Sequence, residues 1–115
     1  MKVVIGGAFS GKTEFVKTKW GYCDAEISDR PGKKVLNHFH LFVKEMLRQG
    51  KDASEIKAAL QNTEVLICDE IGCGIVPAES EERIYRETVG RLMCDICASA
   101  EKVVRIYCGL AEELK

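Results

Sequence analysis

Eight consecutive residues near the start of the chain have the types and spacing of a phosphate-binding loop. They are Gly6, Gly7, Ala8, Phe9, Ser10, Gly11, Lys12 and Thr13, and they match the pattern G-x-x-x-x-G-K-[ST] without a gap. Glycines let such a loop turn tightly and aim several backbone N–H groups at one anion. Lys12 adds a positive charge for the β- and γ-phosphates, and the Thr13 hydroxyl is a ligand for Mg²⁺. The pattern predicts binding of GTP or ATP with Mg²⁺.

The residues around this loop predict the elements that a phosphate site needs. Residues 2–5 are an apolar, β-branched run typical of a buried strand, and residues 14–20 have helical spacing until Gly21 ends it. A helix that starts directly after the loop adds the positive end of its dipole to the anion site. The alternative interpretation is a glycine turn in an ordinary α/β protein. The strand, loop and helix in this order favour the phosphate site.

A second group of candidate residues follows the apolar run 64–68. Asp69 and Glu70 stand at its carboxyl end, where parallel α/β sheets place their ligand sites. A carboxylate there can hold Mg²⁺ directly or through water, or orient an attacking group. We therefore predict Lys12, Glu70 and Asp69 as catalytic residues and Thr13, Glu70 and Asp69 as metal ligands. The alternative is a solvated strand end without chemistry.

The remaining pattern predicts how these residues are positioned. The expected elements are a weak strand at 25–27, a turn at 29–32, a strand at 33–37, a helix at 38–49, a short capped helix from Asp52 to near Asn62, a glycine-punctuated loop at 71–77, a long amphipathic helix at 78–100 and a last strand at 102–108. Strands that alternate with helices predict an α/β fold. We expect a P-loop nucleoside triphosphate hydrolase-like, mostly parallel sheet with flanking helices, as a single small domain over residues 1–115.

Composition excludes several classes of partner. The chain of 115 residues carries 17 basic and 18 acidic residues, a net charge of −1, so no overall field attracts nucleic acid or an anionic membrane. No apolar run approaches the length of a membrane span, and the first residues lack the layout of a signal peptide. We therefore expect a cytoplasmic protein whose recognition of phosphate is local.

Six cysteines raise the question of disulfides or metal. The apolar content of 46% supplies a core without disulfides, so the thiols are expected to be reduced. Cys94 and Cys97 form a C-x-x-C pair, but they fall inside a helical pattern and no second pair follows at the spacing of a zinc site. We expect both side chains to pack in the core, with a zinc or redox role as the alternative.

Four segments together resemble one known family. GGAFSGKT, VLNHFHLFVKEML, DEIGCGIVPAESEERIYRETVGRL and YCGLAEELK are similar, in this order, to the adenosylcobinamide kinase / adenosylcobinamide-phosphate guanylyltransferase family of cobalamin biosynthesis. The resemblance implies a phosphate-loop sheet, nucleotide and Mg²⁺ binding, and a homo-oligomer. It also implies two reactions, phosphorylation of an alcohol of the corrinoid cobinamide and transfer of GMP to that phosphate through a guanylylated histidine.

The chain departs from this family at named positions. The family's segment with the guanylylated histidine has almost no room between residues 20 and 34, and no residue here matches that histidine. His38 and His40 lie in another block, where the family commonly has Asp-Cys followed by Thr, and we expect them to be histidines at a helix start or partly buried. Met93 and Cys94 replace a usual Asn-Gln pair.

The acidic pair also differs from the family, and two functions remain open. Glu70 matches the family's glutamate and Asp69 replaces a common asparagine, so Glu70 is the first choice for the metal. The first hypothesis is a Mg²⁺-dependent transferase, kinase-like or nucleotidyltransferase-like, with Arg83 or Arg86 steadying charge. The second is a nucleotide-binding homologue without catalysis that acts as a switch or assembly partner.

Overall fold

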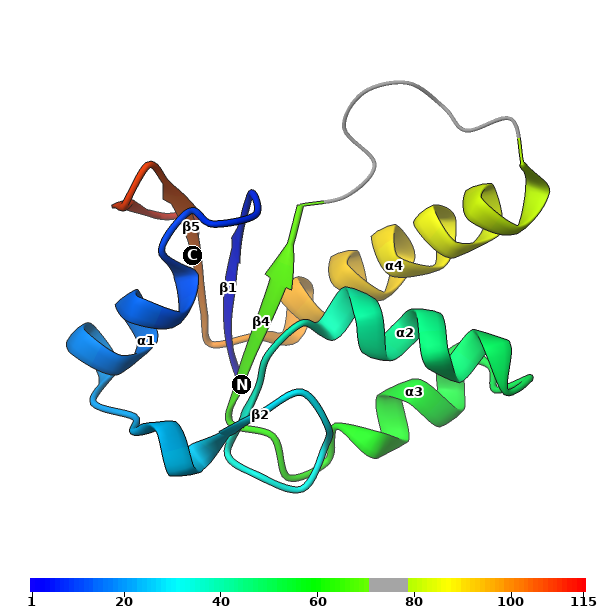
Figure 1. The fold of residues 1–115 in the computed structure, drawn as a ribbon, viewed down its shortest axis with the longest axis horizontal. Coiled ribbons are helices and arrows are strands. Elements are labelled where there is room, and N and C mark those ends of the chain that lie inside the picture. Colours follow the sequence, from blue (N-terminus) through cyan, green and yellow to red (C-terminus); the bar gives the residue numbers. More distant parts are fainter. Residues whose placement is uncertain (71–78) are drawn as a thin grey trace.

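The structure is a computed structural model that describes residues 1–70 and 79–115. Figure 1 shows the elements along the chain. They are β1 (Lys2–Gly6), α1 (Lys12–Trp20), the 3-10 helix η1 (Asp24–Glu26), β2 (Ile27–Ser28), β3 (Val35–Leu36), α2 (Phe39–Arg48), α3 (Ala53–Ala59), β4 (Val65–Asp69), α4 (Ser80–Ser99), β5 (Lys102–Tyr107) and β6 (Leu110–Glu113). The predicted loop at 71–77 lies outside the described residues.

Six strands form one sheet in the order β2-β3-β4-β1-β5-β6. All neighbours are parallel except β5 and β6, which are antiparallel. The expected α/β architecture, a mostly parallel sheet with flanking helices, is confirmed. Gly6 pairs with Asp69 on one side and with Ile106 on the other, so β1 ends between β4 and β5. The loop that follows Gly6 therefore starts at the carboxyl edge of the sheet.

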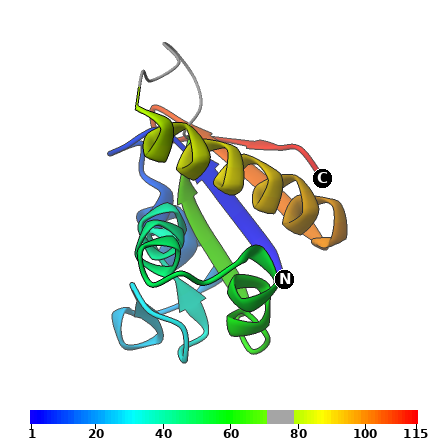
Figure 2. The same cartoon turned by 90° about the vertical axis from the view of Figure 1, so that its right-hand side faces the viewer.

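Helices cover the two faces of the sheet unequally. Because successive side chains of a strand point to opposite faces, each strand contributes to two apolar clusters. The cluster under α1 contains Val4, Val16, Val35, Val65, Ile67, Val104 and Ile106. The cluster under α2, α3 and α4 contains Val3, Leu36, Phe39, Val43, Ile56, Leu60, Leu66, Cys68, Tyr85, Val89, Leu92, Ile96, Ala100 and Val103. Figure 2 shows these three helices together on one side of the sheet.

The structure corrects three expectations. The weak strand at 25–27 is mostly the 3-10 helix η1, and the short strand β2 follows it. The last strand does not include Cys108, which has a φ of 50° and turns the chain into the antiparallel strand β6. Cys94 is exposed, so its expected core packing was wrong, whereas Cys97 is half-buried against the cluster under α4. None of the helices that the structure describes could span a membrane.

Candidate functional site

The loop from Gly6 to Thr13 has backbone geometry that its glycines make possible. A Cβ atom on Gly6 would lie 2.6 Å from the carbonyl oxygen of Ile106 and 2.7 Å from Ser10 Oγ, so this position has room only for glycine. Gly11 has a φ of 96°, in the left-handed region, and the loop also forces Phe9 to a φ of 57°. The backbone N–H of Gly109 donates to Ser10 O at 3.0 Å, which ties the turn before β6 to the loop.

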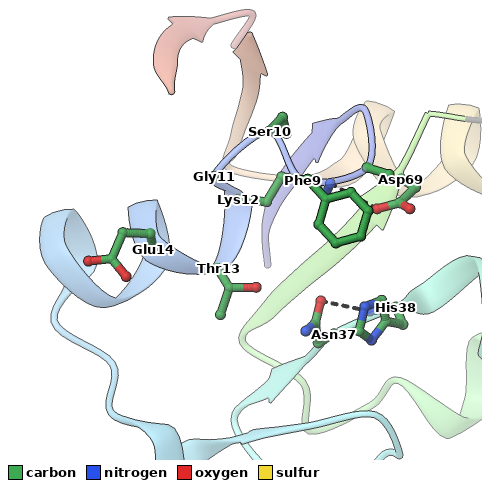
Figure 3. Close-up of a pocket in the computed structure, with 10 residues that line it drawn as sticks. Phe9, Ser10, Gly11, Lys12, Thr13, Glu14, Asn37, His38 and Asp69 are labelled. Carbon is green, nitrogen blue, oxygen red and sulfur yellow. Dashed lines mark hydrogen bonds and ion pairs between the residues drawn. The ribbon is translucent and has the colours of Figure 1, made fainter. Parts of the chain in front are cut away.

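A cavity of about 420 Å³ opens beside this loop. Its lining residues are Ala8, Phe9, Ser10, Gly11, Lys12, Thr13, Glu14, Asn37, His38 and Asp69. Figure 3 shows Lys12 from the loop and Asp69 from the end of β4 meeting at this cavity, with Asn37 and His38 nearby. Seven of these ten residues come from the loop and the start of α1, so the sequence pattern and the cavity coincide.

Among the residues that the structure describes, Lys12 is the only lysine lining the cavity, and its side chain is held in place from two sides. The residue is 7% exposed. Its Nζ donates to Gly7 O at 2.6 Å and lies 2.8 Å from Asp69 Oδ1. A buried ammonium needs such partners, because its charge is costly away from water. The two predicted residues Lys12 and Asp69 are therefore brought into direct contact.

Several polar groups of the loop fit an anion and a metal ion. Gly11 is the N-cap residue of α1 and has no side chain, so the first N–H groups of α1 lack a partner from a capping side chain. The Ser10 hydroxyl oxygen is buried without a hydrogen-bond partner. Thr13 and Asp69 bring a hydroxyl and a carboxylate to the same cavity, the hard oxygen ligands that Mg²⁺ prefers. These residues fit a phosphate group together with Mg²⁺.

Glu70 lies on the other side of the sheet from Asp69. Its carboxylate forms an ion pair with Arg105 of β5, with Oε1 at 2.7 Å from Nε, and Oε2 accepts a hydrogen bond of 3.3 Å from Nη2. Arg105 follows Val104 and precedes Ile106, which both pack under α1, so its side chain takes the opposite face, toward α4. Glu70 does not line the cavity of the loop. The structure brings Asp69, but not Glu70, to Lys12.

Both histidines lie at the start of α2, as expected, and both reach the surroundings of the cavity. His38 precedes α2 with a φ of 53°, lines the cavity, and its Nδ1 lies 3.0 Å from Asp29 Oδ1. His40 is buried, and burial lowers its pKa, so the imidazole is neutral at physiological pH. Its Nδ1 accepts the backbone N–H of Asp69 at 3.3 Å, and its Nε2 lies 3.5 Å from Asp69 Oδ2.

Sequence reasoning missed these contacts of the histidines. A usable signal was present, because His38 and His40 follow the strand β3 and so stand at the carboxyl edge where Asp69 also lies. By contrast, Arg83 and Arg86 were considered as charge-stabilising residues, and neither lines the cavity. Arg86 instead lies 3.9 Å from Glu82 in the same helix.

A second cavity of about 350 Å³ lies between the sheet and α4. It is lined by Ile5, Cys68, Asp69, Glu70, Val89, Gly90, Met93, Cys94 and Cys97. Burial raises the pKa of the Cys68 thiol to about 12 and also raises the pKa of Cys97, so neither is a ready thiolate. Among the residues that the structure describes, no group of three or more His, Cys, Asp or Glu side chains is placed to hold a metal ion.

The fold and the cavity define an α/β protein with a candidate phosphate site at the carboxyl edge of its sheet. Comparison with protein families then assigns the chain. The family model for cobinamide kinase / cobinamide phosphate guanyltransferase matches residues 31–114, from before β3 to the end of β6. The chain belongs to this family, which confirms the resemblance seen in the sequence. The match begins after the Gly6–Thr13 loop. A search of curated proteins found no match.

Proposed function

We propose that this protein binds a purine nucleoside triphosphate with Mg²⁺ in the cavity of the Gly6–Thr13 loop and transfers a phosphoryl group to an alcohol. Family membership implies a role as a cobinamide kinase or cobinamide phosphate guanyltransferase. One observation carries the proposal within this class. A buried lysine and a strand-end carboxylate, Lys12 and Asp69, meet at 2.8 Å beside a loop whose pattern is that of phosphate sites.

Each residue of the site has a separate role in this proposal. The free N–H groups of the loop and the Ser10 hydroxyl would surround phosphate oxygens, and Lys12 would neutralise charge on the transferred group. Mg²⁺, when bound, supplies charge stabilisation and template geometry for the phosphates. Thr13 and Asp69 are the residues that would hold it. We choose Asp69 over Glu70 because Glu70 is paired with Arg105 on the opposite face.

The acceptor in this proposal is an alcohol of a corrinoid, as the family name implies for cobinamide. Phosphoryl transfer is favoured over nucleotidyl transfer, because no residue matches the histidine that carries GMP in the family. His38 is the histidine that lines the cavity. Homo-oligomer formation stays a prediction. The rival function, nucleotide binding without catalysis, is favoured by the shortened segment between α1 and β3, which leaves fewer residues to shape an acceptor site.

Calorimetry tests the binding step. Wild-type protein is titrated with ATP and with GTP, each with and without Mg²⁺, and the expected result is saturable binding that Mg²⁺ strengthens. A folded wild type that binds neither nucleotide would end the proposal.

Labelled GTP separates the two kinds of transfer. With GTP labelled at the α- or the γ-phosphate, corrinoid phosphorylation moves only the γ-label, and no label stays on the denatured protein. Acid-labile, base-stable α-label that is retained on the wild type and lost in His38→Ala would instead show nucleotidyl transfer through His38. Binding without any transfer to cobinamide would favour the non-catalytic rival.

A further inference from the structure

We propose that His40 is a positioning residue that holds the backbone of Asp69 at the end of β4. This inference rests on the proposed function, since Asp69 is there the metal ligand. Its own basis is geometric: Nδ1 of a buried imidazole accepts the backbone N–H of Asp69 at 3.3 Å, and the ring lies against the same residue, with Nε2 at 3.5 Å from Oδ2.

The short strand β3 explains why a side chain is needed at this point. Pairing of β3 with β4 stops at Leu66, three residues before Asp69. The N–H of Glu70 donates to Gly6 O at 2.8 Å, toward β1. Successive N–H groups of a strand point to opposite sides, so the N–H of Asp69 points away from β1, where β3 would continue. His40 Nδ1 takes the place of the missing strand carbonyl.

This backbone contact decides which nitrogen of His40 carries the proton. A backbone N–H can only donate, so Nδ1 must be the unprotonated acceptor. In a neutral imidazole the proton is then on Nε2. The two oxygens of the Asp69 carboxylate have different neighbours, because Oδ1 lies 2.8 Å from Lys12 Nζ and Oδ2 lies 3.5 Å from His40 Nε2.

The difference between these two partners has a functional consequence. Lys12 is the phosphate-binding residue of the proposed function, so its contact with Asp69 competes with the nucleotide. His40 does not line the cavity, and its contacts with Asp69 are independent of the phosphates. His40 therefore keeps the backbone of Asp69 in place when Lys12 turns to the nucleotide. Partners of this kind behind a metal ligand typically change metal affinity by about 10- to 100-fold when they are removed.

Nitrogen-15 NMR tests the tautomer without any nucleotide. The chain has two histidines, so a long-range proton–nitrogen spectrum of the wild type, assigned with His38→Ala, is simple to interpret. At mildly alkaline pH, His40 should show an unprotonated Nδ1 and a protonated Nε2. A protonated Nδ1, or rapid averaging of the two forms, would overturn the proposal.

Variants of His40 test the positioning itself. The readout is the ratio of nucleotide affinities with and without Mg²⁺, measured together with the melting temperature. His40→Ala should lower this ratio by about ten-fold. His40→Asn, whose amide oxygen can replace the Nδ1 acceptor, should keep more of the ratio than His40→Leu, which has an apolar side chain without an acceptor. Val43→Ala, an apolar truncation in the same helix, should lower the melting temperature and leave the ratio unchanged.

The outcomes separate this inference from the proposed function. If the wild type binds nucleotide and Asp69→Asn lowers the ratio, but folded His40→Ala keeps it, the positioning role is wrong and the proposed function stands. If the wild type shows no Mg²⁺-dependent binding, the proposed function fails and the role toward the metal fails with it. If His40→Ala does not fold, the comparison of the Asn and Leu variants decides, and equal ratios would overturn the positioning role.

Discussion

Asp69 and Glu70 are neighbours in the chain, yet the two faces of the sheet hold them in different ways. On the side of the Gly6–Thr13 loop, Asp69 contacts Lys12 and His40 at the edge of the cavity of that loop. On the side of α4, Glu70 is paired with Arg105 and borders a cavity whose walls are mostly apolar and thiol side chains. The two carboxylates thus have different partners, although both residues line the second cavity.

The difference teaches that partners, and not residue type, separate a site from a structural ion pair. Arg105 contacts both oxygens of Glu70, Oε1 through the ion pair with Nε and Oε2 through a hydrogen bond from Nη2, so a cation already neutralises this carboxylate. The partner of Asp69 Oδ1 is instead a lysine on a loop whose Ser10 hydroxyl is buried without a hydrogen-bond partner. Four experiments can break or sharpen this contrast.

Replacement of Lys12 by alanine should have the largest effect. The variant removes the positive charge that Lys12 brings to the cavity of the loop. A charge-assisted contact between a lysine and a phosphate is worth ~1.5–3 kcal/mol, or roughly ten- to a hundred-fold in nucleotide affinity. Calorimetry with Mg²⁺-nucleotide measures the loss. Lys17→Ala is a matched control, since Lys17 lies in the same helix, pairs with Asp24 and does not line the cavity. Equal losses in both variants would contradict the assignment of the cavity.

The exchange of each acid for its amide compares the two faces directly. Asp69→Asn should reduce the Mg²⁺-dependent part of nucleotide affinity by about ten-fold, or ~1.4 kcal/mol, because a neutral amide is a weaker ligand than a carboxylate. Glu70→Gln preserves size and should change that part by less than about two-fold, or ~0.4 kcal/mol. The reverse result would move the metal role to Glu70, as the sequence alone favoured.

A double-mutant cycle of Glu70→Gln and Arg105→Gln should show a smaller effect, on stability alone. Both side chains are partly exposed, so their coupling energy is expected to be about 0.2–1 kcal/mol in the free energy of unfolding. Urea denaturation of the four proteins measures it. A coupling near zero would mean that Arg105 does not restrain Glu70, and the argument that sets Glu70 apart from the metal would lose its basis.

Alkylation of the cysteines tests the packing on the α4 side of the sheet, and we expect it to have the smallest effect on nucleotide binding. The exposed Cys94 should react with iodoacetamide well before Cys68, because the Cys68 thiol is buried and its pKa is raised to about 12. Mass spectrometry of the digested protein gives the order of modification. Nucleotide binding should persist after Cys94 reacts, since Cys94 does not line the cavity of the loop. Early reaction of Cys68 would show that the core cluster under α4 opens readily.

The sequence by itself determined the local parts of this protein. The G-x-x-x-x-G-K-[ST] pattern between a strand and a helix, and the apolar run that ends in Asp69, could be identified because spacing within a few residues sets each element. The alternation of these elements predicted the parallel sheet, and four segments in order indicated the family that the family model confirms. Strand β6 was missed because its residues are exposed and lack the alternation of apolar and polar side chains that marks a strand.

Only the tertiary structure decided which of the two carboxylates belongs to the candidate site. The partners of the acidic pair come from distant parts of the chain, Arg105 at a separation of 35 residues from Glu70 and His40 at a separation of 29 residues from Asp69. Such contacts depend on strand order, on register and on the early end of β3, which no local spacing encodes. The sequence could therefore name two candidate carboxylates, but the face that each one occupies follows from the way the strands pair.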